Sequence, residues 1–90
     1  MILYEDEYSL TFLNKLKKLK KKNKKRFSLL LKKIDTILQN PLHFPMLHHN
    51  MSEFRHAHFD KSFIIIYKIN KNSKKIKFED FGHHDEFFKK

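Results

Sequence analysis

Histidine is the residue type in this sequence that is best suited to chemistry. Seven histidines occur among 90 residues, whereas cysteine is absent, which excludes a cysteine nucleophile, a thiolate metal site and disulfides. Six of the seven form close pairs: His48 with His49, His56 with His58, and His83 with His84. Because the unperturbed pKa of imidazole is about 6.5, such residues can donate or accept a proton near neutral pH. The sequence therefore contains candidates for a general acid and a general base.

Two other interpretations of the histidines stay open. The pairs could be ligands of zinc or nickel, although they come without cysteines and without a HExxH pattern. A histidine on the surface of a basic protein also commonly has no function. That is the interpretation we favour for four of them: His43, His48, His56 and His83.

The middle pair lies in a segment with the alternation of a strand. Residues 54–59 alternate in character, so His56 and His58 face the same side, which is either a groove or the core. If Phe54 packs against the helices, His56 is drawn toward the core near the middle of the strand. His58 would lie at the strand end, where a groove can open. We therefore prefer His58 to His56 as a functional residue.

The N-terminal half has the periodicity of helices. Residues 2–4 could form a short strand, and from about Glu7 the apolar spacing becomes helical. Asn23 interrupts a run of lysines, and a second helix is predicted over residues 24–39. Asn40-Pro41 ends it, because proline disfavours helix at the residue before it. The apolar stripes contain Tyr8, Phe12, Leu16 and Leu19 in the first helix, and Phe27, Leu30, Leu31 and Ile34 in the second. Two facing stripes predict an antiparallel helical hairpin.

The C-terminal half changes to the periodicity of strands. Residues 42–51 are expected to form a loop from the helices to a sheet, and Gly82 is expected to end the last strand. The predicted strands cover residues 54–59, 63–69 and 74–81, with turns at 60–62 and 70–73 and a tail or single helical turn at 83–90. The order β-α-α-β-β-β indicates an α+β fold, with the helices on one face of a small antiparallel sheet. We expect one domain over residues 1–90, whose modest core leaves room only for a surface groove as an active site.

Charge is the most pronounced feature of the composition. Twenty Lys and Arg against ten Asp and Glu give a formal net charge of +10. A domain this basic usually meets a polyanion, which could be nucleic acid or an acidic protein. Nine basic residues lie within residues 15–26, where they could contact RNA phosphates or form solvated helix faces. A lysine-rich proteome that only solubilises its surfaces is the alternative explanation.

A membrane role fits the sequence poorly. Tryptophan is absent, and the helix stripes are needed for the core. The first residues are acidic where a signal peptide would be basic, and the longest apolar run, Phe63 to Tyr67, is too short to cross a bilayer. We therefore expect a soluble cytoplasmic protein with no membrane partner.

Three short motifs resemble those of the RelE/ParE toxin superfamily, in the order in which that family has them. Residues 49–51 (His-Asn-Met) are similar to the "D-H-x-L" of its histidine-rich, YafQ-like branch. Residues 55–58 (Arg-His-Ala-His), followed by the apolar residues 63–67, look like the family's "R-x-x-H … W-h-L-I-Y", with h apolar. Residues 82–88 (Gly-His-His-Asp-Glu-Phe-Phe) are similar to the branch's "G-T/S-H-x-x-L-F". The resemblance implies a RelE-like fold, which is the element order predicted above.

The resemblance also implies a function. The family cleaves mRNA, typically on the ribosome, and is held in check by an acidic cognate antitoxin. Carried onto this chain, the catalytic positions are His49, His58 and His84, which would act without a metal or other cofactor. Phe88 matches a functional C-terminal aromatic, and Arg55 and Lys61 are candidate contacts to the substrate.

One departure from the family pattern affects the fourth catalytic position. The branch carries Asp directly before the apolar strand, where this chain has Ser62. Asp60, two residues earlier, could substitute for it. A second alternative is a toxin of the same fold without catalysis, as in the ParE-like members that poison gyrase, or a basic nucleic-acid-binding or protein-binding module.

Overall fold

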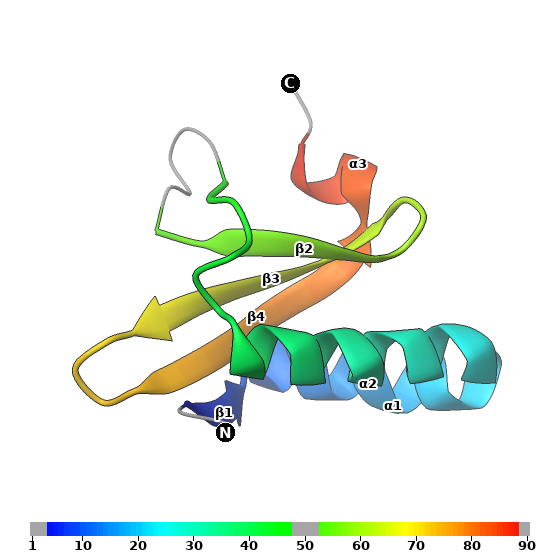
Figure 1. Ribbon diagram of the computed structural model, residues 1–90. Coiled ribbons are helices and arrows are strands. Elements are labelled where there is room, and N and C mark those ends of the chain that lie inside the picture. Colours follow the sequence, from blue (N-terminus) through cyan, green and yellow to red (C-terminus); the bar gives the residue numbers. More distant parts are fainter. Residues whose placement is uncertain (1–3, 48–52, 89–90) are drawn as a thin grey trace.

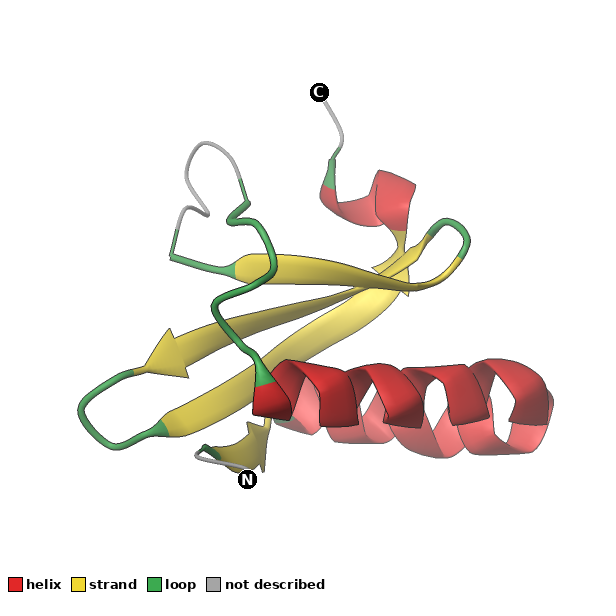
Figure 2. Ribbon diagram, viewed as in Figure 1, coloured by secondary structure: helices red, strands yellow, loops and turns green. Residues whose placement is uncertain are grey.

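The computed structural model describes residues 4–47 and 53–88. Two long helices lie side by side against a twisted sheet, and a short helix follows the last strand (Figures 1 and 2). In chain order the elements are β1 (Glu5–Tyr8), α1 (Leu10–Lys22), α2 (Lys24–Gln39), β2 (Arg55–Asp60), β3 (Phe63–Asn70), β4 (Lys75–His83) and α3 (His84–Phe87). This confirms the predicted α+β fold with the order β-α-α-β-β-β.

The helical hairpin is built around two caps. The Ser9 hydroxyl accepts a hydrogen bond from the Phe12 backbone N–H at 3.0 Å and begins α1. Asn23 ends α1 with its backbone N–H and begins α2 with its side chain, which accepts from the Arg26 N–H. A single residue therefore separates the helices, as the sequence predicted.

The sheet has the order β1-β4-β3-β2, so the first and last strands of the chain are neighbours. β2, β3 and β4 are antiparallel, but β1 pairs with β4 in parallel, from Glu5 opposite Lys75 to Tyr8 opposite Phe78. The predicted antiparallel arrangement is confirmed for β2, β3 and β4, and β1 adds a parallel strand at one edge, whose pairing the sequence did not predict. The helical hairpin between β1 and the sheet acts as a crossover, which is what a parallel pair requires.

Three predicted boundaries are wrong. The first strand is Glu5–Tyr8 rather than residues 2–4, of which only Tyr4 is described and lies outside the strand. Helix α1 begins at Leu10 rather than near Glu7, because Ser9 caps it and residues 5–8 pair with β4. Gly82 does not end β4: it is buried within the strand opposite Ile64. A Cβ there would lie 2.7 Å from Glu86 Oε1, so glycine leaves room for a side chain of α3.

The main core lies between the helical hairpin and one face of the sheet. Phe12 packs its ring against Tyr8, Phe78 and Phe81, with centroid distances of 4.9–5.8 Å. Tyr67 is fully buried and donates a hydrogen bond to the Pro41 carbonyl oxygen at 2.6 Å. The buried members are Phe12, Leu30, Ile34, Ile37, Leu38, Ala57, Phe59, Ile65, Tyr67, Ile76, Phe78 and Phe81.

The opposite face of the sheet, here called the open face, carries a much smaller apolar cluster. Leu47, Ile64 and Ile66 are buried, and Phe54 packs beside them, so Phe54 does not face the helices. Residues 45–47 run along the outer edge of β2, where Leu47 N–H donates to the Phe54 carbonyl oxygen. Of the part of the chain that the structure describes, no helix is long and apolar enough to cross a membrane.

Candidate active site

Four aromatic side chains form a cluster at the α3 end of the open face. The rings of His58 and His84 are stacked, with centroids 5.9 Å apart and an interplanar angle of 21°. Phe88 stacks on His84 at 4.3 Å, and its ring also contacts His56 at 5.2 Å. The His56 and His58 rings are 6.2 Å apart, which closes the set. We call these four residues the histidine cluster.

Strand alternation places the two histidines of β2. Ala57 and Phe59 are buried in the main core, so His56 and His58 between them point to the open face. His58 lies opposite Ile64 and is exposed, whereas the partly buried His56 lies opposite Ile66. The buried isoleucines thus form the floor beneath the imidazoles.

Helix α3 places the other two members. The His84 N–H donates to the Ser62 carbonyl oxygen at 2.5 Å, which ties the start of α3 to the β2–β3 turn. Phe88 N–H donates to the His84 carbonyl oxygen, so one helical turn separates the two residues. Because residues four apart lie on the same side of a helix, their rings stack.

His83 has a structural role that the sequence did not predict. Its Nδ1 accepts a hydrogen bond from the Asp85 N–H at 3.1 Å and caps α3. The Asp85 carboxylate also lies 3.5 Å from His84 Nδ1, which makes it the acidic neighbour of that imidazole. Asp85 is 82% exposed, so water weakens this interaction.

The structure brings together two of the three predicted catalytic histidines. His58 and His84 stack on each other and Phe88 joins them, as the cluster geometry above shows. His49 lies outside the described residues. His56, which we expected to be without function, belongs to the cluster because Phe54 packs on the open face. The alternation of residues 54–59 already placed it on the same side as His58.

Arg55 does not join the cluster. It lies on the helix-facing side of β2, and its guanidinium donates to the Phe44 carbonyl oxygen at 2.7 Å. Asp60 is likewise occupied elsewhere, since Arg26 Nε donates to its carboxylate at 2.6 Å. Lys61 is exposed in the β2–β3 turn, next to the Ser62 that holds His84. Ser62 is therefore adjacent to the cluster, and its contact with His84 is made by the Ser62 backbone.

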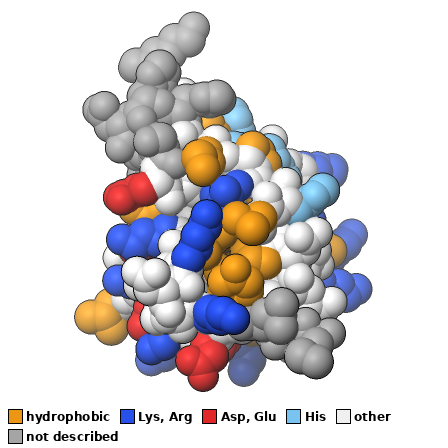
Figure 3. Space-filling view, turned by 60° about the vertical axis from the view of Figure 1, so that its left-hand side comes forward, with side chains coloured by type: hydrophobic (Ala, Val, Ile, Leu, Met, Phe, Trp, Pro, Cys, Tyr) orange, Lys and Arg blue, Asp and Glu red, His pale blue; other side chains and the backbone are white. Residues whose placement is uncertain are grey.

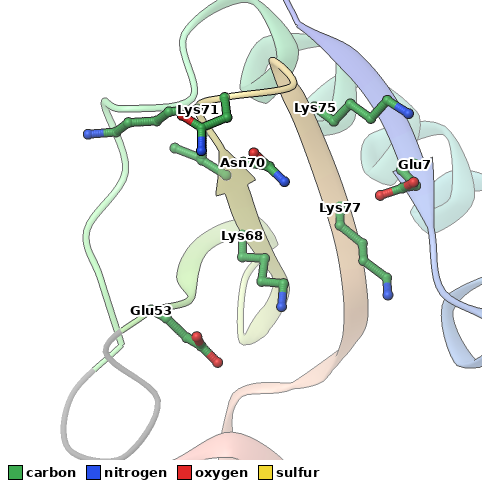
Figure 4. A pocket seen from close by; sticks show the side chains of 9 residues that line it. Glu7, Glu53, Lys68, Asn70, Lys71, Lys75 and Lys77 are labelled. Atoms are coloured by element: carbon green, nitrogen blue, oxygen red, sulfur yellow. The ribbon is translucent and has the colours of Figure 1, made fainter.

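A hollow lies at the end of the strands away from α3, toward the β3–β4 turn. It has a volume of about 410 Å³ and contains four lysines and two glutamates: Lys68, Lys71, Lys75, Lys77, Glu7 and Glu53. Lys68 and Lys77 project from paired positions on β3 and β4, and the glutamates lie at its two sides (Figure 4). We call it the lysine hollow. In Figure 3, Lys and Arg side chains lie beside and below a hydrophobic patch, with histidines toward the upper right.

Within residues 4–47 and 53–88, no group of three or more His, Cys, Asp or Glu side chains is arranged to hold a metal ion. The rings of the histidine cluster meet mainly face to face and edge to face, which is a packing geometry.

Comparison with known proteins agrees with the fold and with the sequence motifs. The family model for the ParE toxin of the type II toxin–antitoxin system parDE matches residues 7–88. A Methanocaldococcus jannaschii protein that is named as a toxin, RelE4, is 40% identical over 88 residues, which cover 98% of this chain and 94% of that protein. Crystalline YafQ from E. coli is 29% identical, with a TM-score of 0.66 and coverage of 94% and 98%. The toxin–antitoxin complex RelBE2 from Mycobacterium tuberculosis is 15% identical, with a TM-score of 0.77 and coverage of 92% and 93%.

The fold and the motif order define a toxin of the RelE/ParE class. The chain belongs to the ParE toxin family of type II toxin–antitoxin systems. The predicted superfamily is thereby confirmed, and YafQ is one of several structural neighbours rather than a unique match.

Proposed function

We propose that this toxin is a metal-independent endoribonuclease that cleaves mRNA with histidines as general acid and base. The observation that carries the proposal is the stacked pair of His58 and His84, 5.9 Å apart on the open face. Each imidazole is partly or fully accessible, and both reach the same surface. His49 is the third histidine of the proposal, on the motif resemblance alone.

The reaction needs no group beyond those of the RNA and the protein. The ribose 2′-oxygen attacks the adjacent phosphorus while one imidazole takes the 2′-hydroxyl proton. The bond from phosphorus to the 5′-oxygen breaks, and a second, protonated imidazole gives its proton to that oxygen. The products are a 2′,3′-cyclic phosphate and a free 5′-hydroxyl. Each positioned proton-transfer group typically contributes about 10²–10⁴-fold to the rate.

Phe88 and Lys61 supply binding and charge in this proposal. The Phe88 ring is partly exposed beside His84, so an unstacked base can pack on it. The Lys61 ammonium would stabilise the charge of the pentacoordinate phosphorus. Arg55, held by the Phe44 carbonyl oxygen, would act on the substrate only after exchanging that contact.

The lysine hollow extends the proposed RNA path along the open face. Lys68 is on the same face as the histidine cluster, because it continues the alternation of Ile64 and Ile66 on β3. Lys77 shares that face as the β4 partner of Lys68. If backbone phosphates of an RNA bind in the lysine hollow, an adjoining part of the same RNA chain would lie over His58 and His84. Such contacts raise affinity without selecting a sequence.

The proposal includes a cytoplasmic protein with two macromolecular partners besides mRNA. One is an acidic cognate antitoxin, by analogy with the DinJ–YafQ toxin–antitoxin complex of E. coli, whose toxin is 28% identical to this chain. The other is the ribosome, whose RNA the basic stretch at residues 15–26 would contact.

A defined oligoribonucleotide tests the mechanism. The purified chain, incubated with excess EDTA, should cleave the RNA and leave a 2′,3′-cyclic phosphate. The same oligonucleotide with a single 2′-deoxy substitution at the cleaved position should resist cleavage, because the nucleophile is missing. Cleavage of the deoxy-substituted RNA would contradict the mechanism. Loss of cleavage of the unsubstituted RNA when EDTA is added would also contradict it.

A cellular measurement separates the enzyme from a non-catalytic toxin of the same fold. After the chain is induced, primer extension on mRNA should show cuts in phase with codons, and blocking translation should abolish them if the ribosome is required. Growth arrest without any cuts would favour the gyrase-directed or binding alternative.

A further inference from the structure

A group of contacting residues on the helix-facing side of the molecule has no part in the proposed cleavage reaction. Arg26, in the first turn of α2, contacts two residues that flank the β2–β3 turn. Its Nε donates to Asp60 Oδ2 at 2.6 Å, and its guanidinium carbon lies 3.9 Å from the centroid of the Phe63 ring. We call Arg26, Asp60 and Phe63 the turn clamp.

The burial and chemistry of the turn clamp distinguish it from a surface ion pair. The side chains of Arg26 and Asp60 are only 31% and 20% exposed, so water screens their attraction less than at a fully exposed site. A planar guanidinium can donate to a carboxylate while its face stacks on an aromatic ring, which an ammonium cannot do. The backbone of Arg26 is also fixed, since its N–H donates to the Asn23 side chain.

The turn that the clamp holds is strained and short. Lys61 and Ser62 are the only residues between β2 and β3, and Lys61 has a φ of 47°, in the left-handed region. That conformation is unfavourable for a residue with a side chain and persists when its neighbours hold it. Asp60 and Phe63, one on each side, are the residues that Arg26 contacts.

The same turn holds the start of α3 from its other side. The Ser62 carbonyl oxygen accepts from the His84 N–H. The Phe63 ring packs edge to face on His83, with centroids 5.5 Å apart, and His83 caps α3. A continuous path of contacts therefore leads from α2 through the turn to His84, although Arg26 itself lies on the helix side of the sheet.

We propose that Arg26 is a positioning residue, which fixes the β2–β3 turn through Asp60 and Phe63 and thereby sets the place of His84 relative to His58. This inference rests on the proposed ribonuclease function for its consequence in catalysis, but its structural part does not. It also gives Asp60 a role in holding the turn, so Asp60 need not replace the carboxylate that the family has at the Ser62 position.

The test combines cleavage kinetics with NMR of the free protein. The variants are Arg26→Ala, Arg26→Lys, Asp60→Asn and the double variant Arg26→Ala with Asp60→Asn. The matched control is Lys32→Ala, which removes one positive charge from an exposed position of the same helix. The readouts are the hydrogen-exchange rate of the His84 amide, the ring signals of His58 and His84, and kcat and KM measured separately.

Loss of the clamp should free the His84 amide and move its ring. Arg26→Ala and Asp60→Asn should each increase the exchange rate of the His84 amide at least about tenfold relative to the amides of β3. Both variants should also shift the His84 ring signals. They should lower kcat by roughly 10- to 100-fold with KM changed less than about twofold, since a small misplacement of a catalytic group costs this much. The double variant should be no worse than Arg26→Ala, Arg26→Lys should recover only part of kcat, and Lys32→Ala should match the unaltered protein.

The NMR readout keeps the two proposals separable. Wild-type His84 amide exchange and ring signals in Arg26→Ala and Asp60→Asn would overturn the clamp, whatever the cleavage rates are. If Arg26→Ala does not fold, the near-isosteric Asp60→Asn decides the question. An unaltered chain that cleaves no RNA refutes the ribonuclease, while the same NMR comparison still supports or overturns the clamp.

Discussion

The two faces of the sheet are built from the same strands but differ in almost every physical property. Toward the helices, alternate residues of β2, β3 and β4 are buried and join one large apolar cluster. Toward the open face, the apolar cluster of the described residues has three buried members, and the surface around it carries imidazoles and lysines. Neighbouring residues of β2 show the contrast, since Ala57 is 2% exposed whereas His58 is exposed.

This difference separates stability from chemistry. The helix-covered face holds most of the apolar area that folding removes from water, which is the main favourable contribution to stability. The open face leaves titratable groups accessible where a polyanion can approach them. A substitution on one face should therefore change one property and leave the other largely unaltered.

The largest effect is expected from the stacked histidines. His84→Ala and His58→Ala should each reduce RNA cleavage by about 10²–10⁴-fold, because each removes a proton-transfer group. The free energy of unfolding should change little for the exposed His58, by roughly 0.5 kcal/mol or less. Single-turnover cleavage and urea unfolding measure the two quantities. His43→Ala is the control, and a variant without His58 and His84 that still cleaves at the normal rate would remove the basis of the proposal.

The reverse pattern is expected on the other face. Phe12→Ala should lower the free energy of unfolding by about 3–5 kcal/mol, since Phe12 is fully buried among three aromatic rings. Phe54→Ala, on the partly buried open-face cluster, should cost less than half of that. Chemical denaturation gives both values. Equal losses for the two phenylalanines would show that the open face contributes as much to folding as the covered one.

A binding effect without a catalytic effect is expected at the lysine hollow. Lys68→Gln should raise KM for RNA with kcat nearly unchanged, and the logarithm of affinity should depend less steeply on the logarithm of salt concentration. The slope should fall by about 0.7 for this substitution and by about twice that when Lys77→Gln is added, the value for single-stranded nucleic acid. Titrations at several salt concentrations test this, with Lys32→Gln as control. An unchanged slope would place the RNA elsewhere.

The smallest effect concerns pH and the covered face. Burial raises the pKa of Tyr67 above its usual value of 10.0, with Arg55 opposing the shift to a lesser extent. Burial is also the main cause that raises the pKa of Tyr8, and the hydrogen bond from Tyr8 to Asp6 raises it further. Below about pH 10 both phenols are neutral in the folded and unfolded chain, so their stabilising effect is complete. At higher pH the unfolded chain ionises first, and the free energy of unfolding should fall.

Tyr67→Phe tests this pH dependence. It should cost about 1 kcal/mol at neutral pH, because the Pro41 carbonyl oxygen loses its donor. It should also make the decline above pH 10 shallower, leaving the part that Tyr8 contributes. Unfolding curves measured between pH 8 and 12 give the comparison. A Tyr67→Phe variant as pH-sensitive as the unaltered chain would contradict the assignment.

The parts of the fold that sequence predicted well are those with local signals. The second helix was predicted at residues 24–39, where α2 is found, because Asn23 and Asn40-Pro41 mark its ends. The first strand was misplaced because Glu5 to Glu7 are exposed and charged, with no apolar alternation to reveal them. Its parallel pairing depends on Lys75 to Phe78, about 70 residues away, which no local pattern encodes.

The sequence predicted the kind of candidate site but not all of its residues. Strand alternation placed His56 and His58 on one side, yet it could not say which side faced the helices. That depended on Phe54, which packs with Leu47 on the open face. The family motif supplied His84 and Phe88, whose contact with His58 arises only when α3 folds back over the sheet. The role of Arg26 was not predictable, because Asp60 and Phe63 are more than thirty residues from it.

The parallel pairing of β1 with β4 has a consequence for biosynthesis. The N-terminal strand has no strand partner until residues 75–78 have been translated, and His84 follows them within ten residues. Long-range contacts of this kind close late, so the sheet and its imidazole pair are completed together, only after residue 84 has been translated.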